Sequence, residues 1–157
     1  MDLTVWSAAD HANATLMESR IRANFAAIGS TSTYTPTVGG TGWTKGNGTL
    51  TGYYIDTGAN VQLAIKFILG TTSTGGTGGL TFSVPVGTIA TGEASGSLVM
   101  LKGGATWIGS CLATGSTITA LAITTAAGQA GLVVNGVPTP GNWTTADAFY
   151  LSLSYFR

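Results

Sequence analysis

The stretch NVQLAIKFIL, from Asn60 to Leu69, carries the clearest structural signal in the chain. Large apolar side chains fill every second position, and Gln, Ala, Lys and Ile fill the positions between them. Successive side chains of a β-strand point to opposite faces of a sheet, so this alternation predicts a strand with one buried face. The side chains predicted to point inward are Val61, Leu63, Ile65, Phe67 and Leu69.

The same alternation returns in the C-terminal stretch DAFYLSLSYFR, with Phe149, Leu151, Leu153 and Tyr155 predicted to point inward. Shorter strand candidates lie between Gly, Thr, Ser and Pro turns in the stretches TLTGYYID, LTFSVPV, GSLVML, ATWIGSCL, TITALAI and GLVVNGV. About eight strands at such regular spacing predict an antiparallel, jelly-roll-like β-sandwich over residues 37–157. The connections are too short for crossover helices, which excludes a parallel βαβ sheet.

The first 29 residues show a different pattern. Between residues 13 and 28 the apolar side chains recur at helical spacing, with Asn13 as a predicted N-cap and Gly29 as a predicted stop. Because one helix of about four turns is marginal alone in water, its apolar stripe needs a partner. We therefore expect residues 1–29 to form an arm and a short α-helix that anchor or trimerise the protein, and residues 30–36 to form a linker. The side chains predicted to anchor it are Leu3, Val5, Trp6, Met17, Ile21 and Phe25.

The charge content is low. Six Lys and Arg residues balance six Asp and Glu residues, and only 8% of the chain is charged, against roughly 25% in an ordinary soluble domain. So little electrostatic repulsion favours self-association or docking onto a larger assembly. The scattered basic residues argue against a nucleic-acid partner, and no apolar run is long enough to predict membrane insertion.

The residues needed for common chemistry are scarce. Cys111 is the single cysteine and His11 the single histidine, so an intrachain disulfide is excluded, and a zinc site or a nucleophile-base pair is not predicted. The glycine-rich stretch GTTSTGGTGGLTF, residues 70–82, has no Lys after its glycines and leads into a strand. It is predicted to be a flexible hairpin tip rather than a phosphate loop. We expect no catalytic residue, no metal and no cofactor.

Two other functions remain open. A glycan-binding module could use exposed aromatic side chains, for which the candidates are Trp43, Tyr53, Tyr54 and Trp107, with the tip at 75–79 beside them. A glycan hydrolase would need two facing carboxylates, and the candidates are Asp56, Glu93 and Asp147. A turn or capping role is favoured for each of these carboxylates.

Three stretches resemble bacteriophage proteins. The stretch VWSAADHANATLMESRIRANFAAIG, residues 5–29, resembles the entry segment of phage minor tail proteins. The stretches from Tyr34 to Val86 and from Thr139 to Phe156 resemble phage surface proteins, with a GNGTLTGYY motif, a glycine-rich tip and a closing strand that begins TPGNW. The resemblance implies a trimeric, jelly-roll-like virion component that is held to the particle by its N-terminal segment, and it supplies no catalytic residues.

We therefore expect a non-enzymatic structural protein on the virion, assembled in the host cytoplasm. Its expected form is a homotrimeric capsid decoration protein or short head fibre, in contact with the major capsid protein or another virion protein. The alternative is a tail appendage or minor tail protein that binds a glycan of the host surface.

Overall fold

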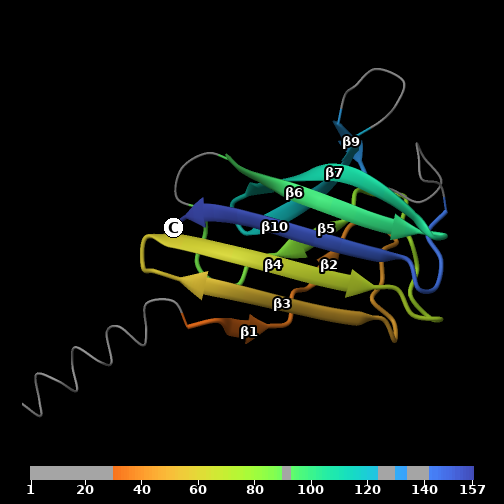
Figure 1. Cartoon of the computed structure of the whole chain (residues 1–157), viewed down its shortest axis with the longest axis horizontal. Helices are drawn as coiled ribbons and strands as arrows, with labels where there is room; N and C mark the ends of the chain where they lie inside the picture. Colours follow the sequence, from red (N-terminus) through yellow and green to blue (C-terminus); the bar gives the residue numbers. More distant parts are fainter. Residues whose placement is uncertain (1–29, 90–92, 124–129, 134–141) are drawn as a thin grey trace, which may run out of the picture.

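The computed structural model describes residues 30–89, 93–123, 130–133 and 142–157, and within them the chain is built of β-strands. Nine strands follow one antiparallel path in the order β1-β3-β4-β10-β6-β7-β8-β5-β2, and β9 pairs with β8 beside this path (Figure 1). The strands are β1 (Ser32–Tyr34), β2 (Val38–Gly39), β3 (Thr49–Asp56), β4 (Asn60–Ile68), β5 (Thr81–Ser83), β6 (Glu93–Lys102), β7 (Ala105–Thr114), β8 (Thr117–Ile123), β9 (Ala130–Leu132) and β10 (Ala148–Phe156).

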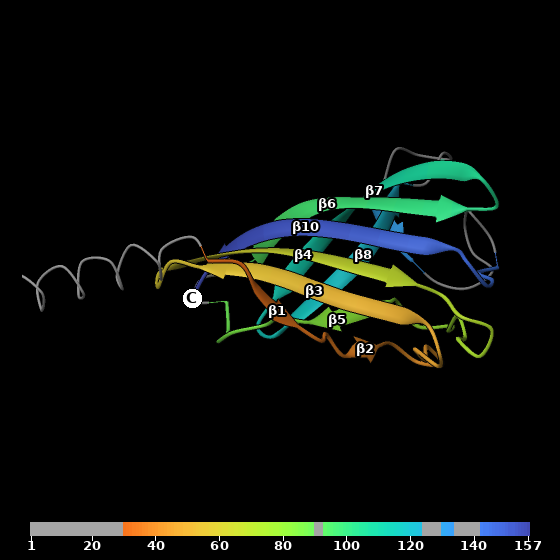
Figure 2. The ribbon, with the colours of Figure 1, turned by 60° about the horizontal axis from the view of Figure 1, so that its bottom comes forward.

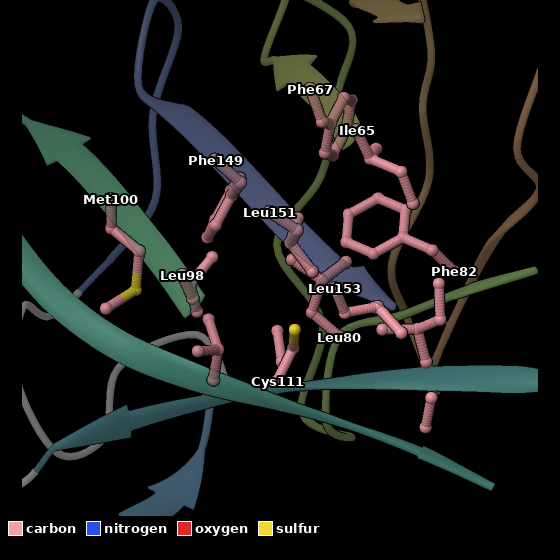
Figure 3. Packing of buried hydrophobic residues seen from close by; sticks show 14 of the residues in the cluster. Ile65, Phe67, Leu80, Phe82, Leu98, Met100, Cys111, Phe149, Leu151 and Leu153 are labelled. Atoms are coloured by element: carbon pink, nitrogen blue, oxygen red, sulfur yellow. The ribbon is translucent and has the colours of Figure 1, made fainter. Parts of the chain in front are cut away.

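The alternation read from β4 and β10 is confirmed. Every side chain predicted to point inward from these two strands is buried. The two strands pair directly, with Leu151 opposite Ile65, and β6 continues the register with Leu98 opposite Leu151. Adjacent strands thus bring their apolar side chains to the same face of the sheet, where they form the core (Figure 3).

The sheet curls until its two halves face each other. Phe67 on β4 lies edge-on to Phe82 on β5, with ring centroids 6.0 Å apart, although four strands separate β4 from β5 in the sheet. The edge strands β1 and β2 are joined by residues 35–37 alone, and this link crosses between the two edges (Figure 2). Hydrogen bonds fasten the crossing, because Tyr34 Oη donates to Ser83 O at 3.4 Å and Thr37 N donates to Ser83 Oγ at 2.9 Å.

The described strands therefore form one curled antiparallel sheet. The predicted mainly β class and the antiparallel pairing are confirmed, whereas two separate sheets, as a sandwich requires, are not observed in the described residues. The predicted linker at 30–36 contains β1, which pairs with β3. Residues 1–29 lie outside the described part, and with them the predicted helix and its anchoring side chains Leu3, Val5, Trp6, Met17, Ile21 and Phe25.

The glycine-rich stretch is not a hairpin tip, which corrects the prediction. It connects β4 to β5, which do not pair with each other, and it packs against the loop before β3. Trp43 Nε1 donates to Gly78 O at 2.7 Å, and Gly78 N donates to Thr41 O at 3.1 Å. A Cβ on Gly76 would lie 2.1 Å from Thr41 O. The glycines are thus required because two backbones approach closely, rather than because the loop is flexible.

Polar side chains complete this loop-to-loop contact. Asn47 exchanges hydrogen bonds with Thr72, because Asn47 N donates to Thr72 Oγ1 and Thr72 N donates to Asn47 Oδ1, both at 2.9 Å. Thr44 and Thr74 form an isolated bridge, with backbone hydrogen bonds of 3.2 Å in both directions. Threonine and asparagine side chains therefore add hydrogen bonds between the two loops.

Candidate binding surface

The outer face of the sheet, away from the core, carries an exposed apolar row. The pairing register aligns Lys66 on β4, Tyr150 on β10, Val99 on β6 and Ile108 on β7 across four neighbouring strands. Ile108 is 68% exposed, Val99 is 36% exposed, and Leu101, two residues after Val99 on the same face, is 38% exposed. We call the three side chains of Tyr150, Val99 and Ile108 the outer row.

This face is almost free of charge. Lys66 is the only charged residue among the described side chains at outward positions of β3, β4, β6, β7, β8 and β10. Its Nζ lies 5.7 Å from the centroid of the Tyr150 ring, within the range of a cation–π contact. The solvent face of an antiparallel sheet is normally polar and charged, and the described side chains of this face differ from that pattern in their low charge and in the exposed apolar row.

A shallow hollow of about 220 Å³ lies on the same face, at the β1 side of the sheet. It is lined by Thr31, Tyr53, Tyr54, Ile55, Gln62, Leu63 and Ala64. The small Ala64 lies directly opposite Tyr53 in the pairing of β3 with β4, and Ser152 and Ser97 continue this row of small residues across β10 and β6. The hollow therefore opens toward the middle of the outer face.

Two of the aromatic residues predicted to contact a ligand pack against the core, Trp43 fully and Tyr54 in part. Trp43 is 5% exposed, and its ring lies edge-on to Phe149 with centroids 5.9 Å apart. Tyr54 is partly buried against the core, and its ring lies edge-on to Tyr34 at 5.8 Å. Trp43 packs in the core and against the glycine-rich loop. Because its side chain is buried, it is not accessible to a sugar.

The other two aromatic residues do not form a platform together. Tyr53 is 46% exposed on the outer face of β3, whereas Trp107 on β7 points to the opposite face and packs partly against the core. Three strands separate β3 from β7, which corresponds to roughly 19 Å at the usual strand spacing. Of the four predicted residues, Tyr53 and Tyr54 line the hollow, and only Tyr53 points outward from the sheet with an exposed side chain.

The sequence analysis missed the residues of the outer row. Val99, Ile108 and Tyr150 are outward members of stretches that were predicted as strands, and inward side chains were predicted only for the strand of Tyr150. The signal was present in the alternation, because an outward position occupied by Val or Ile instead of Ser or Thr marks a face that is not fully solvated. It could be read only once the neighbouring strands were known.

Asp56 and Asp147, two of the three candidate carboxylates, form hydrogen bonds within turns. Asp56 Oδ1 accepts a hydrogen bond from Gly58 N at 2.8 Å, and Asp56 Oδ2 lies 2.9 Å from Arg157 Nη2. Asp147 is 4% exposed and accepts hydrogen bonds from Thr144 N at 2.8 Å and Gly103 N at 3.2 Å. These contacts confirm the turn and capping roles favoured for both residues.

The two carboxylates also lie at opposite ends of the sheet. Asp56 is level with Tyr155 through the pairing of β3, β4 and β10, whereas Asp147 precedes the first residue of β10. The eight-residue offset amounts to roughly 26 Å, against about 5–9.5 Å between the two carboxyl groups of a glycosidase. Asp56 and Asp147 of one chain therefore cannot act together on one glycosidic bond, and the Glu93 side chain lies outside the described part.

Cys111 is a core residue, as expected. Its side chain is 1% exposed, and burial raises the pKa of its thiol from 9.0 to about 11. A buried thiol of raised pKa is a poor nucleophile at neutral pH. Among the described residues, no three His, Cys, Asp or Glu side chains gather where they could hold a metal ion, and no helix of that part could span a membrane.

Comparison with protein families, with curated proteins and with solved structures finds no match to this chain. The resemblance to bacteriophage proteins therefore stays a prediction from the sequence.

Proposed function

We propose that this chain is a non-enzymatic structural protein of a bacteriophage virion. In this proposal it is a homotrimeric capsid decoration protein or short head fibre that is attached through its N-terminal segment. The supporting observation is the outer face, which combines an exposed apolar row with a single charged residue among its described side chains. A soluble monomer gains nothing from such a face, whereas a component of an assembly can bury it. A curled sheet whose two halves enclose one core also suits the jelly-roll-like architecture of this class.

Sedimentation of the full chain tests the trimer. The expected mass is about three times the 15.8 kDa of one chain. A concentration series is needed, because a weak trimer dissociates on dilution. A species that remains at the mass of one chain up to high micromolar concentration would contradict a trimer that is stable off the particle.

Immunogold electron microscopy tests the location on the virion. Antibody against the purified chain should label the heads of intact particles that carry this protein. Label confined to the tails would replace the capsid location with the tail appendage, and particles without label would contradict the proposal that the chain is displayed on the virion.

A glycan-binding function is the second candidate. It is favoured by Tyr53, whose exposed ring borders the hollow of about 220 Å³. Aromatic rings at the edge of a hollow are common sugar-stacking groups. A glycan array with the wild-type chain and Tyr53→Ala should then show a signal that this substitution removes, with Phe156→Ala as a control because Phe156 is an exposed aromatic at the C-terminal end of β10. A blank array would count against this function.

A further inference from the structure

The outer face needs a cover, and the segment of the chain before residue 30 is positioned to supply it. Ser32 of β1 pairs with Tyr54 of β3, so the chain enters the sheet at the end where β3 finishes. Thr31, the second residue of the described chain, lines the hollow on the outer face. The chain therefore enters the described structure at the margin of a face that no other described residue covers.

We propose that residues 13–28 pack as an amphipathic helix across the outer face of β4, β10 and β6 of the same chain. A helix of this length spans about 24 Å at a rise of about 1.5 Å per residue. From the level of Ser30 to Val99 the path covers five residues along the strands and four strands across, a direct distance of roughly 25 Å. The segment is therefore long enough to run from the hollow to the outer row.

The side chains of the two surfaces match in kind. The stripe of the predicted helix carries Met17, Ile21 and Phe25. Phe25 precedes Ser30 by five residues and fits the hollow, whereas Met17 lies two to three helical turns further on and fits the outer row. Packing these groups together removes apolar area from water on both surfaces. This burial would stabilise the helix and the sheet together.

The two surfaces offer one pair of opposite charges, whereas Arg20 and Arg22 of the segment have no acidic partner among the described side chains of this face. Glu18 is the only acidic residue between positions 13 and 28, and Lys66 is the only charged side chain described at the outward positions of the six strands of this face. Glu18 follows Met17 directly and therefore flanks the apolar stripe. A carboxylate at this place on the docked helix would come near the Lys66 ammonium, and the pair would favour one direction of the helix over the other.

This inference concerns contacts within one chain, and it competes with the proposed function for the outer face. A helix that covers β4, β10 and β6 leaves Ile108 on β7, which is 68% exposed, as the apolar group of this face for a neighbour in an assembly. The inference assigns two different roles to the two parts of the N-terminal segment. Residues 13–28 cover the sheet, and Leu3, Val5 and Trp6 are left to attach the protein to a larger assembly.

Thiol labelling of the full chain tests the cover. In Val99→Cys the new thiol would lie under the helix, and in Thr77→Cys it would lie in the glycine-rich loop between β4 and β5, where Thr77 is exposed. The native Cys111 is buried, so we expect it not to react with maleimide in either variant. We expect maleimide to react with the Val99→Cys variant at least about tenfold more slowly than with the Thr77→Cys variant, because labelling under the helix would require the helix to open.

Substitutions in the segment supply the matched control. Ile21→Asp places a charge in the apolar stripe, and Ser19→Asp places the same charge on the opposite side of the predicted helix. Ile21→Asp should raise the labelling rate in Val99→Cys about tenfold and leave Thr77→Cys unchanged, whereas Ser19→Asp should change neither rate. Fast labelling of Val99→Cys in the otherwise native chain, or an equal effect of the two Asp substitutions, would overturn the proposal.

Disulfide trapping decides whether the helix covers its own chain. Oxidation of the double variant Met17→Cys with Val99→Cys should give a cross-link within one chain, seen as a monomer of altered mobility on a non-reducing gel. Cross-linked dimers or higher species would assign the helix to a neighbouring copy and overturn the same-chain assignment. Absence of any cross-link would count against the cover itself.

Discussion

Phe67 and Phe82 meet edge-on across the core with ring centroids 6.0 Å apart, although β10, β6, β7 and β8 separate their strands in the sheet. Phe67 also stacks on Phe149 of the neighbouring β10, with centroids 6.0 Å apart and ring planes 20° apart. The three rings therefore link strands that pair directly with strands that meet only because the sheet curls. This contact joins the two halves of the sheet through side chains rather than through backbone hydrogen bonds.

Replacing Phe82 by Ala should destabilise the protein strongly. Its side chain is 1% exposed, and its loss would open a cavity where the two halves of the sheet meet. We expect the free energy of unfolding to fall by about 3–5 kcal/mol, as for other buried Phe to Ala changes. Urea unfolding should show this, with Phe156→Ala as the control, because Phe156 is 64% exposed and should cost less than about 1 kcal/mol. Equal losses in the two variants would contradict the curled core.

Replacing Gly76 by Ala should also destabilise the protein. The added methyl group would lie 2.1 Å from Thr41 O and 2.5 Å from Trp43 N, and both atoms belong to the backbone of the facing loop. We expect the two loops to separate at a cost of about 1–3 kcal/mol, measured by urea unfolding. Thr77→Ala, at the exposed neighbouring position, should be neutral. A neutral Gly76→Ala would contradict the close approach of the two backbones and would show that this loop is free to move.

The long strands were predictable because the alternation of apolar and polar residues is visible within each stretch of sequence. Alternation in β4 and β10 identified the buried set from Val61 to Phe67 and from Phe149 to Tyr155, and the structure confirms it. β1 and β2 were missed because they are strands of three and two residues, too short for any alternation to be visible. Their pairing depends on the curl of the whole sheet, which no local pattern encodes.

The candidate surface was less predictable for the same reason. Tyr53 was one of four aromatic residues named as possible ligand contacts, and its side chain is 46% exposed. Trp43 was misjudged because its burial depends on the glycine-rich loop, which brings Gly78 O within 2.7 Å of its Nε1. The outer row is visible only after the register aligns Tyr150, Val99 and Ile108 from three strands distant in sequence.

Asp147 should be much more important for stability than Asp56. Asp147 is 4% exposed and gathers hydrogen bonds from Thr144 N, Gly103 N and, at 3.3 Å, Lys102 Nζ. Asp147→Ala leaves these donors without their acceptor and should lower the free energy of unfolding by about 2–4 kcal/mol.

Asp56→Ala is the matched control for that substitution. Its ion pair with Arg157 is far more exposed, and its loss should cost about 1 kcal/mol or less. Thermal unfolding of both variants in parallel measures the difference. An equal loss of stability in the two variants would contradict the structural role that we assign to the Asp147 cluster.

The Cys111 thiol should make stability depend on pH in the alkaline range. Burial raises its pKa from 9.0 to about 11, so the folded protein keeps the thiol protonated at pH values where the unfolded chain releases the proton. This contribution is complete below pH 9 and is lost as the pH rises toward 11, by roughly 1–3 kcal/mol in total. Burial also raises the pKa of the Tyr155 phenol, which adds to the alkaline loss of stability in the native chain and in Cys111→Ala alike. Urea unfolding from pH 8 to pH 11 measures the free energy of unfolding of the native chain and of Cys111→Ala. The difference between the two proteins should shrink as the pH rises. A constant difference would contradict a thiol that is buried in its protonated form.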